Sequence, residues 1–389
     1  MLSRRVVLGS GFLASNLAVL KAAAAPADVI RIPIRVSSGR LWTSVSLDGR
    51  DPVRFMIDTG SGGYLIDDDT AVALGLKSSL PTSIAGVVGS RDARGYWVSQ
   101  VVVGGALRDT DAYMVATPFE DFIKGALPGW FLGVYKSEID FTGNEIRLYP
   151  SGGPDLTGYE RLKLIRHNID VRPMTPGMQR ARDPHLTVLV ELDGQKLRLT
   201  IDTGAPSMVT LFPSASRYVD LWKTQGARGG KGRGVSGGYD MRMARADTLK
   251  IGGSVISRPV ISVVDPSRTA YNKVDGLLGL DAIRRFQWVV DAAGGEVAIK
   301  PNGAFGLAQR IDRSGLEGQS SGGRIRVTGV LPDSPAQAAG LRPGDVIATK
   351  EGSRAFWNAL QGAPGEVVEF EVQRDGKAMP VRIVLKDIV

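Results

Sequence analysis

Short runs in which apolar and polar residues alternate recur along most of the chain, separated by glycine-containing turns. Examples are IRIPIRV from Ile30 and LWTSVSLDGR from Leu41, the second of which ends in an Asp-Gly turn. Alternation with a period of two predicts β-strands with one buried face. Helical periods are few and short, and AVALGL from Ala71 is one of them. We therefore expect a mainly β protein with short helices.

One stretch of this pattern occurs twice. Phe55 to Ser61 reads FMIDTGS and Leu199 to Ala205 reads LTIDTGA, with the two aspartates 144 residues apart (202 − 58). Three other pairs recur at similar offsets: VVVGGAL with LKIGGSV, Phe131-Leu132-Gly133 with Leu277-Leu278-Gly279, and IDFTGNEIRLYP with VDAAGGEVAIKP. Landmarks in register predict the duplication of one lobe of ~150 residues.

In each copy an apolar strand ends on Asp-Thr-Gly, and there is a chemical reason for each of these three residue types at its position. A rigid strand fixes the carboxylate, a threonine hydroxyl can bond backbone across a symmetry axis, and glycine permits a tight turn with positive φ. Two carboxylates within hydrogen-bond reach share one proton. Asp58 and Asp202 are therefore the candidate catalytic pair, one as a general base for water and the other as a general acid for a carbonyl oxygen.

The duplicated motif resembles the active site of the retropepsin and pepsin-like aspartic proteases. The resemblance implies a two-lobed β-barrel pseudo-dimer that hydrolyses peptide bonds in peptide or protein substrates, with no metal or organic cofactor. Thr59 and Thr203 would brace the two loops, beside the turn residues Gly60 and Gly204. Ser61 would donate a hydrogen bond to a catalytic carboxylate, whereas Ala205 cannot. Two glycine-rich hairpins would close over the substrate as flaps; their candidate residues are Gly86, Gly89, Tyr96, Gly234, Gly237 and Tyr239.

The segment after the apolar-Gly triplet differs between the lobes. From Gly133 to Asp140 there are 7 positions (140 − 133), against 12 from Gly279 to Asp291 (291 − 279). DGLLGLDAIRRF (Asp275 to Phe286) resembles the apolar-Gly segment and helix of retropepsin-like lobes. We therefore expect the equivalent helix of the first lobe to be shortened or missing.

The chain changes character near Pro301. VTGVLPDSPAQAAGLRPGDVI (Val327 to Ile347) resembles bacterial PDZ domains, which implies a small β-sandwich with short helices. Such domains take an extended peptide as an added strand and hold its terminal carboxylate on backbone N–H groups. Our candidate for that loop is Phe305-Gly306-Leu307. The unit would recruit substrate C-termini or regulate access to the active site. The alternative is a unit of this fold that only packs on the protease. A recruiting domain should be removable without loss of short-peptide cleavage.

The predicted organisation has five parts. They are a signal peptide (1–27), lobe 1 (28–150), a linker (151–184), lobe 2 (185–302) and the PDZ-like unit (303–389). Arg4-Arg5 precede an apolar run that ends in small residues, with an A-x-A cleavage pattern at Ala25-Pro26-Ala27. Export to the periplasm is expected, by the general or the twin-arginine route. Retention as a membrane anchor is the alternative, and after cleavage no stable membrane insertion is expected.

Composition removes several other classes of function. The 389 residues include no cysteine, so a thiol nucleophile and a disulfide scaffold are excluded. Net charge is +8, of which Arg4, Arg5 and Lys21 supply three, and the remaining +5 (8 − 3) is scattered. Nucleic-acid binding is therefore not expected. Asp67-Asp68-Asp69 resemble metal ligands, but acidic residues before a helix predict an N-cap.

Two rival functions stay open. One is a non-catalytic peptide-binding protein of the cell envelope. The other is a serine protease, because residues 234–238 match G-x-S-x-G and G-x-S-G-G. Both histidines, His167 and His185, precede Ser236, and neither lies far enough upstream for two intervening barrels. Residues 232–237 also match the dinucleotide pattern G-x-G-x-x-G, without the strand and helix that it requires.

Overall fold

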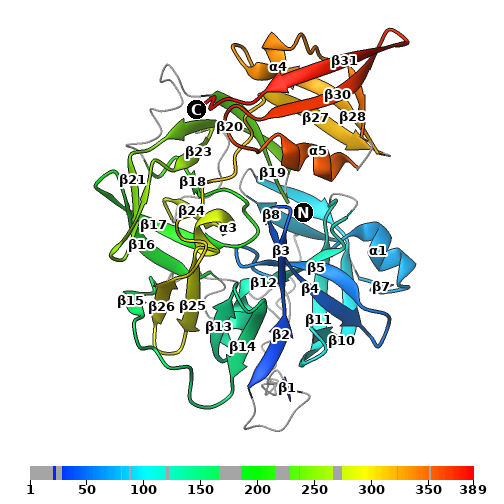
Figure 1. Cartoon of the computed structure of the whole chain (residues 1–389). Coiled ribbons are helices and arrows are strands. Elements are labelled where there is room, and N and C mark those ends of the chain that lie inside the picture. Colours follow the sequence, from blue (N-terminus) through cyan, green and yellow to red (C-terminus); the bar gives the residue numbers. More distant parts are fainter. Residues whose placement is uncertain are drawn as a thin grey trace, which may run out of the picture.

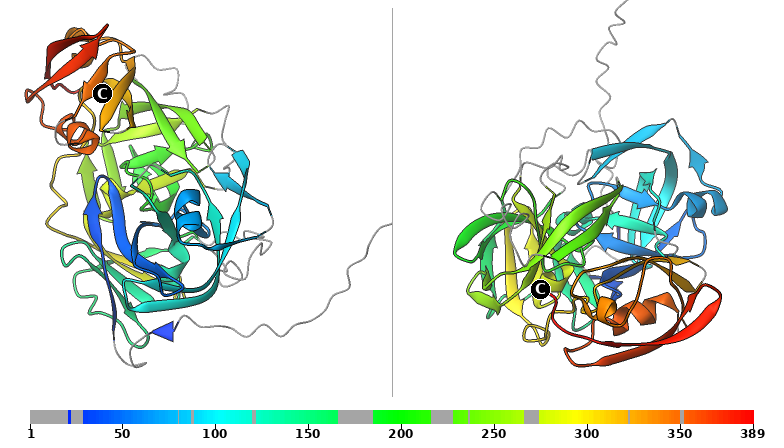
Figure 2. Two further views of the ribbon diagram at one scale, coloured as in Figure 1. Left: turned by 90° about the vertical axis from the view of Figure 1, so that its right-hand side faces the viewer. Right: turned by 90° about the horizontal axis from the view of Figure 1, so that it is seen from above.

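The computed structural model describes residues 21–22, 29–79, 81–86, 89–119, 122–165, 185–215, 228–235, 237–265, 274–321, 323–349 and 352–389. Two β lobes lie side by side, a six-stranded sheet joins them, and a C-terminal unit sits across one end (Figures 1 and 2). The fold is mainly β, as the alternation predicted. No helix in the described part is long and apolar enough to cross a bilayer.

The first lobe is built on a nine-stranded sheet whose central strands close into a barrel. The order β11-β6-β12-β5-β4-β10 is closed by pairing of β10 with β11. Short strands flank this ring: β1 pairs with β11, β3 with β4, and β7 with β10. The strands are β1 (Lys21–Ala22), β3 (Arg35–Ser37), β4 (Arg40–Leu47), β5 (Val53–Asp58), β6 (Tyr64–Ile66), β7 (Lys77–Ser78), β10 (Gly95–Val103), β11 (Leu107–Ala116) and β12 (Gly125–Pro128).

The second lobe repeats this arrangement in the order β20-β23-β18-β24-β17-β16-β21. The Asp-Thr-Gly strand is β5 in lobe 1 and β17 in lobe 2, and each lies between the preceding antiparallel strand and a parallel strand from later in the lobe. The strands are β16 (Thr187–Leu192), β17 (Gln195–Asp202), β18 (Val209–Leu211), β19 (Arg228–Gly234), β20 (Gly237–Arg245), β21 (Thr248–Ile251), β22 (Ser254–Ser257), β23 (Val260–Val264) and β24 (Gly276–Gly279).

The register of the parallel strands corrects one pair of sequence landmarks. Pro128 lies opposite Asp58, and Gly279 lies opposite Asp202. The equivalent of Leu277-Leu278-Gly279 is therefore Ala126-Leu127-Pro128, not Phe131-Leu132-Gly133. The sequence match was misleading because Pro128 replaces the glycine of the second lobe.

The predicted shortening of the first-lobe helix is wrong for the same reason. Counted from Pro128, Asp140 is 12 residues away (140 − 128), which equals the 12 residues from Gly279 to Asp291 (291 − 279). A 3-10 helix, η1 (Gly129–Gly133), stands where lobe 2 has α3 (Leu280–Ile283). The segment that follows the strand beside each dyad loop is therefore equally long in the two lobes.

A six-stranded sheet runs through both lobes in the order β15-β26-β25-β13-β14-β2. Its middle pair joins β13 of lobe 1 to β25 of lobe 2, with Ile139 opposite Trp288. Both residues are buried, so the lobes share one core. The predicted linker contributes β15, and residues 166–184 lie outside the described part. The strands are β2 (Ile30–Pro33), β13 (Lys136–Asp140), β14 (Glu145–Tyr149), β15 (Glu160–Lys163), β25 (Phe286–Asp291) and β26 (Glu296–Pro301).

The C-terminal unit forms one five-stranded antiparallel sheet, not the two sheets of a sandwich, because its consecutive strands pair in sequence order. Ser334 caps α4 by accepting a hydrogen bond from the N–H of Gln337, as the Ser-Pro pattern predicted. The elements are β27 (Leu316–Ser321), β28 (Arg324–Val330), α4 (Pro335–Ala338), β29 (Val346–Ala348), α5 (Ser353–Ala359), β30 (Val367–Arg374) and β31 (Lys377–Val384).

The segment between β26 and this sheet belongs physically to lobe 2. The Phe305 ring packs edge-on against Phe286, 5.4 Å between centroids. Arg285, 2% exposed, donates a 3.0 Å hydrogen bond to the Phe305 carbonyl. Phe305-Gly306-Leu307 therefore cannot be the predicted peptide-carboxylate loop, because β27 begins nine residues after Leu307 (316 − 307).

The first helix, α1 (Asp68–Ala73), begins as predicted. The Asp67 carboxylate accepts hydrogen bonds from the N–H and the hydroxyl of Thr70, at 3.1 and 2.8 Å. Asp68 is paired with Arg94 and Tyr96. The acidic run is therefore explained by capping and ion pairing.

Candidate active site

The two Asp-Thr-Gly loops meet face to face between the lobes. A Cβ built on Gly60 would lie 2.6 Å from Cγ of Asp202, and a Cβ on Gly204 would lie 2.5 Å from Cγ of Asp58. Neither glycine has positive φ in this structure, which corrects the turn argument made from the sequence. Glycine is required because the opposite carboxylate occupies the space of a side chain.

Two buried threonines lock the loops together, as their position after each aspartate predicted. The Thr59 hydroxyl donates to the carbonyl of Ile201 at 2.6 Å, and the Thr203 hydroxyl donates to that of Ile57 at 2.6 Å. Each hydroxyl also accepts a hydrogen bond from the other threonine's N–H, at 3.1 and 2.9 Å. Four reciprocal bonds between fully buried groups hold the two carboxylates at a fixed separation.

The two carboxylates have different surroundings. Asp58 Oδ1 accepts one backbone bond, from Gly60 N at 3.1 Å. Asp202 Oδ1 accepts two, from Gly204 N at 2.8 Å and Ala205 N at 3.2 Å. Asp202 is 8% exposed, whereas Asp58 is half-buried. The protein therefore provides more hydrogen-bond donors for a charge on Asp202 than for one on Asp58.

These surroundings assign the shared proton. Burial raises the pKa of Asp58 well above the ordinary carboxyl range, and the charge and hydrogen bond of Asp202 raise it further. Burial also raises the pKa of Asp202, but bonds from Gly204, Asp58 and Ala205 lower it in part. With one proton on the pair, the additional backbone donor at Asp202 favours the charge on Asp202 and the proton on Asp58.

Ser61 does not have the predicted role in this structure. Its hydroxyl donates to the carbonyl of Gly63 at 2.7 Å instead of to a catalytic carboxylate. The asymmetry of the pair comes instead from the backbone, because Ala205 N reaches Asp202 while Ser61 N bonds the main-chain oxygen of Asp58 at 3.0 Å.

Both predicted flaps are hairpins. In lobe 1, β8 (Thr82–Gly86) pairs with β9 (Gly89–Ala93), with Gly86 opposite Gly89. In lobe 2, β19 pairs with β20, with Gly234 opposite Gly237. The hairpins touch across the lobes, because Arg91 Nε donates to the carbonyl of Val235 at 2.9 Å. Together they form a bridge between the lobes.

The two flap tyrosines are not equivalent. Tyr96 lies in β10, outside its hairpin, and its hydroxyl donates to Asp68 at 2.6 Å, so it is not a flap residue. Tyr239 lies in β20, and a Cβ on Gly232 would lie 2.2 Å from its ring. Burial raises the pKa of Tyr239, and the charge of Asp202 raises it further. Tyr239 is therefore the flap tyrosine whose pKa responds to the charge of the dyad.

A second apolar cluster covers the face of β5 that carries Asp58. Alternation puts Met56 and Asp58 on one face of the strand, and Met56 packs in this cluster, separately from the main core. Val235 at the tip of the second hairpin packs against it. The sequence did not single out this cluster, whose buried members are Trp42, Met56, Leu65, Ile84, Ile123 and Ala126.

The serine-protease reading finds no support in the described geometry. Ser236 and His167 lie outside the described residues, and the Ser61 hydroxyl bonds the backbone carbonyl of Gly63.

No group of three histidine, aspartate or glutamate side chains in the described ranges is placed to hold a metal ion.

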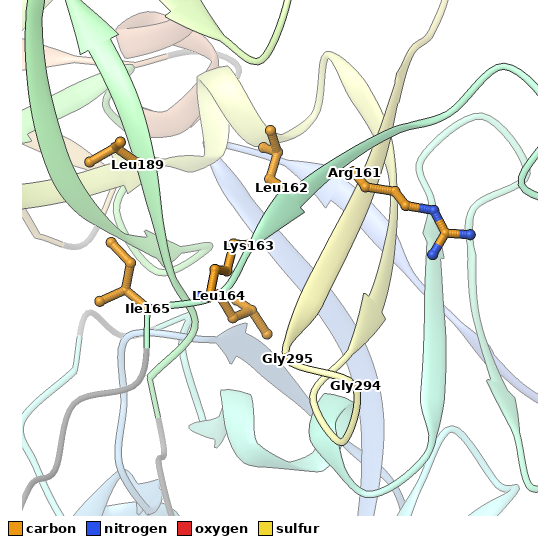
Figure 3. Close-up of a pocket in the computed structure, with 8 residues that line it drawn as sticks. All are labelled: Arg161, Leu162, Lys163, Leu164, Ile165, Leu189, Gly294 and Gly295. Carbon is orange, nitrogen blue, oxygen red and sulfur yellow. The ribbon is translucent and has the colours of Figure 1, made fainter.

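An open pocket lies elsewhere, between β15, β16 and the turn from β25 to β26. Figure 3 shows the aliphatic side chains of Leu162, Leu164, Ile165 and Leu189 gathered there. None of its lining residues belongs to the Asp-Thr-Gly loops or the hairpins. It is therefore not part of the candidate active site.

Comparison with known proteins agrees with this geometry. Residues 43–134 and 188–282 match the family model of aspartyl proteases, one segment in each lobe. Among solved structures, the chain is similar to an aspartic proteinase from Irpex lacteus, with 11% identity and a TM-score of 0.45 over 72% of this chain and 99% of that one. No curated protein matches the chain. The two matched segments contain Asp58 and Asp202 and support an aspartic protease with two lobes.

Proposed function

We propose that this protein is an aspartic endopeptidase in which Asp58 and Asp202 activate a water molecule for attack on a peptide bond. The observation that carries the proposal is the interlocked pair of Asp-Thr-Gly loops, which holds the two carboxyl groups close enough to share one proton. The repeated match to the aspartyl protease family model supports it.

The asymmetry of the pair suggests the order of proton transfers. Ionised Asp202 takes a proton from water while Asp58 gives its proton to the carbonyl oxygen, which yields a neutral tetrahedral diol. In the second step Asp202 returns a proton to the amide nitrogen and Asp58 takes one from a hydroxyl. The C–N bond then breaks to give an acid and an amine, and the pair again holds one proton.

The inhibitor profile tests the proposal against both rivals. The purified protein should cleave an unfolded protein substrate, and a pepstatin-like inhibitor should block cleavage while a serine-directed reagent should not. Inhibition by the serine reagent alone would establish the serine-protease alternative. Binding of peptides without any cleavage across the acidic to neutral range would establish the non-catalytic alternative.

We further propose that the protein is exported, on the strength of Arg4-Arg5, the apolar run and the A-x-A pattern. The segment lies outside the described residues, apart from Lys21–Ala22 in β1. Mature protein from the envelope should begin at Asp28, as read by N-terminal sequencing. Envelope protein that still begins before Arg4 would favour an uncleaved anchor.

For the C-terminal unit we propose a PDZ-like role in substrate recruitment. Its support is β27, an edge strand that pairs only with β28 in the described sheet and so can accept an added strand. The loop ahead of β27 is already occupied, because Asp312 accepts hydrogen bonds from the N–H groups of Ser314 and Gly315, at 3.2 and 2.9 Å. A ligand's terminal carboxylate would compete with Asp312, so an internal extended segment fits this edge better than a free C-terminus.

Removing this unit tests recruitment. The cut must leave Phe305, Leu307 and Gln309 in place, because Arg285 bonds the first two carbonyls and Gln309 bonds the backbone of Val260. Deletion of Ile311 to Val389 should keep kcat/KM for a short peptide without acidic residues within about threefold and raise KM for a protein substrate. Equal losses on both substrates by a folded truncation would mean that the unit braces the active site instead.

The C-terminal unit makes contacts through which it could brace the two lobes. Arg354 of α5 donates to the hydroxyl of Ser37 in lobe 1 at 3.0 Å. At the other side, Arg245 of β20 donates to the terminal residue Val389 at 3.0 and 3.2 Å. The C-terminal unit thus contacts both lobes, consistent with its position across them in Figure 1.

A further inference from the structure

The strand next to Asp58 carries a cation toward the dyad. In the antiparallel pair β4–β5, Trp42 lies opposite Met56 and Thr43 lies opposite Phe55. Continuing this register by two residues from Trp42 and Met56 brings Arg40 level with Asp58. Alternation also puts Arg40 on the same face of β4 as Trp42, the face of the apolar cluster. Arg40 therefore stands at the lobe-1 side of the dyad.

The turn that presents Arg40 is held from three sides. Ser38 and Gly39 form a tight turn, with φ of 53° and 66°. A Cβ on Gly39 would lie 3.1 Å from Cβ of Pro206, the residue after the second Asp-Thr-Gly-Ala. Trp42 Nε1 donates to the carbonyl of Ser37 at 2.9 Å, and Arg354 bonds the Ser37 and Ser38 hydroxyls. The start of β4 is thus pre-organised, as a specificity residue requires.

The guanidinium of Arg40 is close enough to act electrostatically on the dyad without pairing with it. Its charge lowers the pKa of Asp58, Asp202 and Tyr239, against the larger effect of burial, which raises each of them. Within the described residues no carboxylate oxygen lies within 4.0 Å of it, and its hydrogen bond is to the carbonyl of Gly39 at 3.1 Å. In the described part of the chain the guanidinium makes no hydrogen bond to the dyad, so its other N–H donors can bind a group of the substrate.

We propose that Arg40 is a specificity-determining residue that binds a carboxylate of the peptide substrate within one or two residues of the scissile bond. The guanidinium fork matches a carboxylate with two parallel hydrogen bonds. Trp42 and Met56 on the same face are buried, at 2% and 6% exposed, so recognition at this point falls to the half-buried Arg40. The inference rests on the proposed peptidase function, and it adds the class of substrate: peptides that are acidic close to the cleavage site.

Matched peptides test the inference. Pairs that differ only in Glu or Gln at one position beside the scissile bond should differ in kcat/KM by about tenfold at the best position, mainly through KM. A second set, with a free or an amidated C-terminus just beyond the scissile bond, separates a side-chain carboxylate from a terminal one. In R40Q the preference for the charged member should fall to about one, R40K should restore part of it, and R40E should prefer a Lys peptide.

Arg108 provides a control on the same lobe. It is exposed in β11 and lies opposite Val102, which pairs with Ser46, six residues along β4 from Arg40 (46 − 40). R108Q removes the same charge and should keep the Glu-to-Gln ratio.

Three outcomes would overturn the inference. In the first, the wild type cleaves Glu and Gln peptides equally at every position. In the second, R40Q keeps the wild-type Glu-to-Gln ratio of kcat/KM. In the third, R40Q changes kcat/KM equally for all peptides and shifts the whole pH profile. The last would identify Arg40 as a counter-charge of the dyad only. If the wild type cleaves no peptide at all, the proposed function fails instead, so the two failures are distinguishable.

Discussion

Asp58→Asn and Asp202→Asn are each expected to abolish peptide cleavage while the protein stays folded. An amide cannot take or give the proton that the pair exchanges with water and substrate, and positioned acid–base groups contribute about 10²–10⁴-fold each. Cleavage of a fluorogenic peptide, measured at several pH values, checks the result. Residual activity within about tenfold of wild type, or ~1.4 kcal/mol of barrier, would contradict the assignment.

Stability provides the control for these variants, and its sign follows from the pKa shifts. Burial raises the pKa of Asp58 above its unfolded value, so the folded state binds the proton more tightly. The wild type therefore loses stability as pH rises from the unfolded pKa, about 3.9, through the folded one. Asparagine does not titrate, so Asp58→Asn should gain stability relative to wild type across that window in thermal melts. A variant that is inactive and also unfolded at neutral pH would say nothing for catalysis and would contradict this expectation.

Gly60→Ala and Gly204→Ala are expected to be nearly as damaging, although they change no polar atom. A Cβ at these positions would lie 2.6 and 2.5 Å from the opposite carboxyl carbon, which is closer than real Cβ contacts. The carboxylate must therefore move, and a misplacement of about 1 Å costs about 10²-fold in rate. We expect a loss of that order in kcat, measured on the same peptide.

Gly303→Ala is the matched control for the two glycine variants. A Cβ there meets nothing within 4 Å, and its backbone does not have positive φ. Full activity in Gly303→Ala together with a large loss in Gly60→Ala and Gly204→Ala would locate the effect at the dyad. Near-normal rates in all three would show that the loops yield easily and that the close approach is not required for catalysis.

The sequence by itself determined the features that depend on local chemistry or on the duplication of one lobe. Alternation with a period of two specifies strands wherever they lie, and Asp67 and Ser334 cap their helices through side-chain bonds to residues three positions away. Duplication of Asp-Thr-Gly predicted that Asp58 and Asp202 would meet, because two copies of one lobe related by symmetry bring equivalent loops together. The threonine bonds follow from the same symmetry.

Only the tertiary structure decided features that depend on register and on contacts between distant segments. Which residue of β12 lies opposite Asp58 is set by strand pairing, so Pro128 replaced the glycine that the sequence match suggested. Tyr96 and Tyr239 sit 38 (96 − 58) and 37 (239 − 202) residues after their aspartates, yet the Tyr96 hydroxyl is bonded to Asp68 outside the hairpin, whereas Tyr239 lies in its hairpin strand. Arg40 gained its place from a register with β5 and from Pro206, 166 residues away (206 − 40). Such positions depend on how two sheets pack against each other, and no local pattern in the chain encodes that packing.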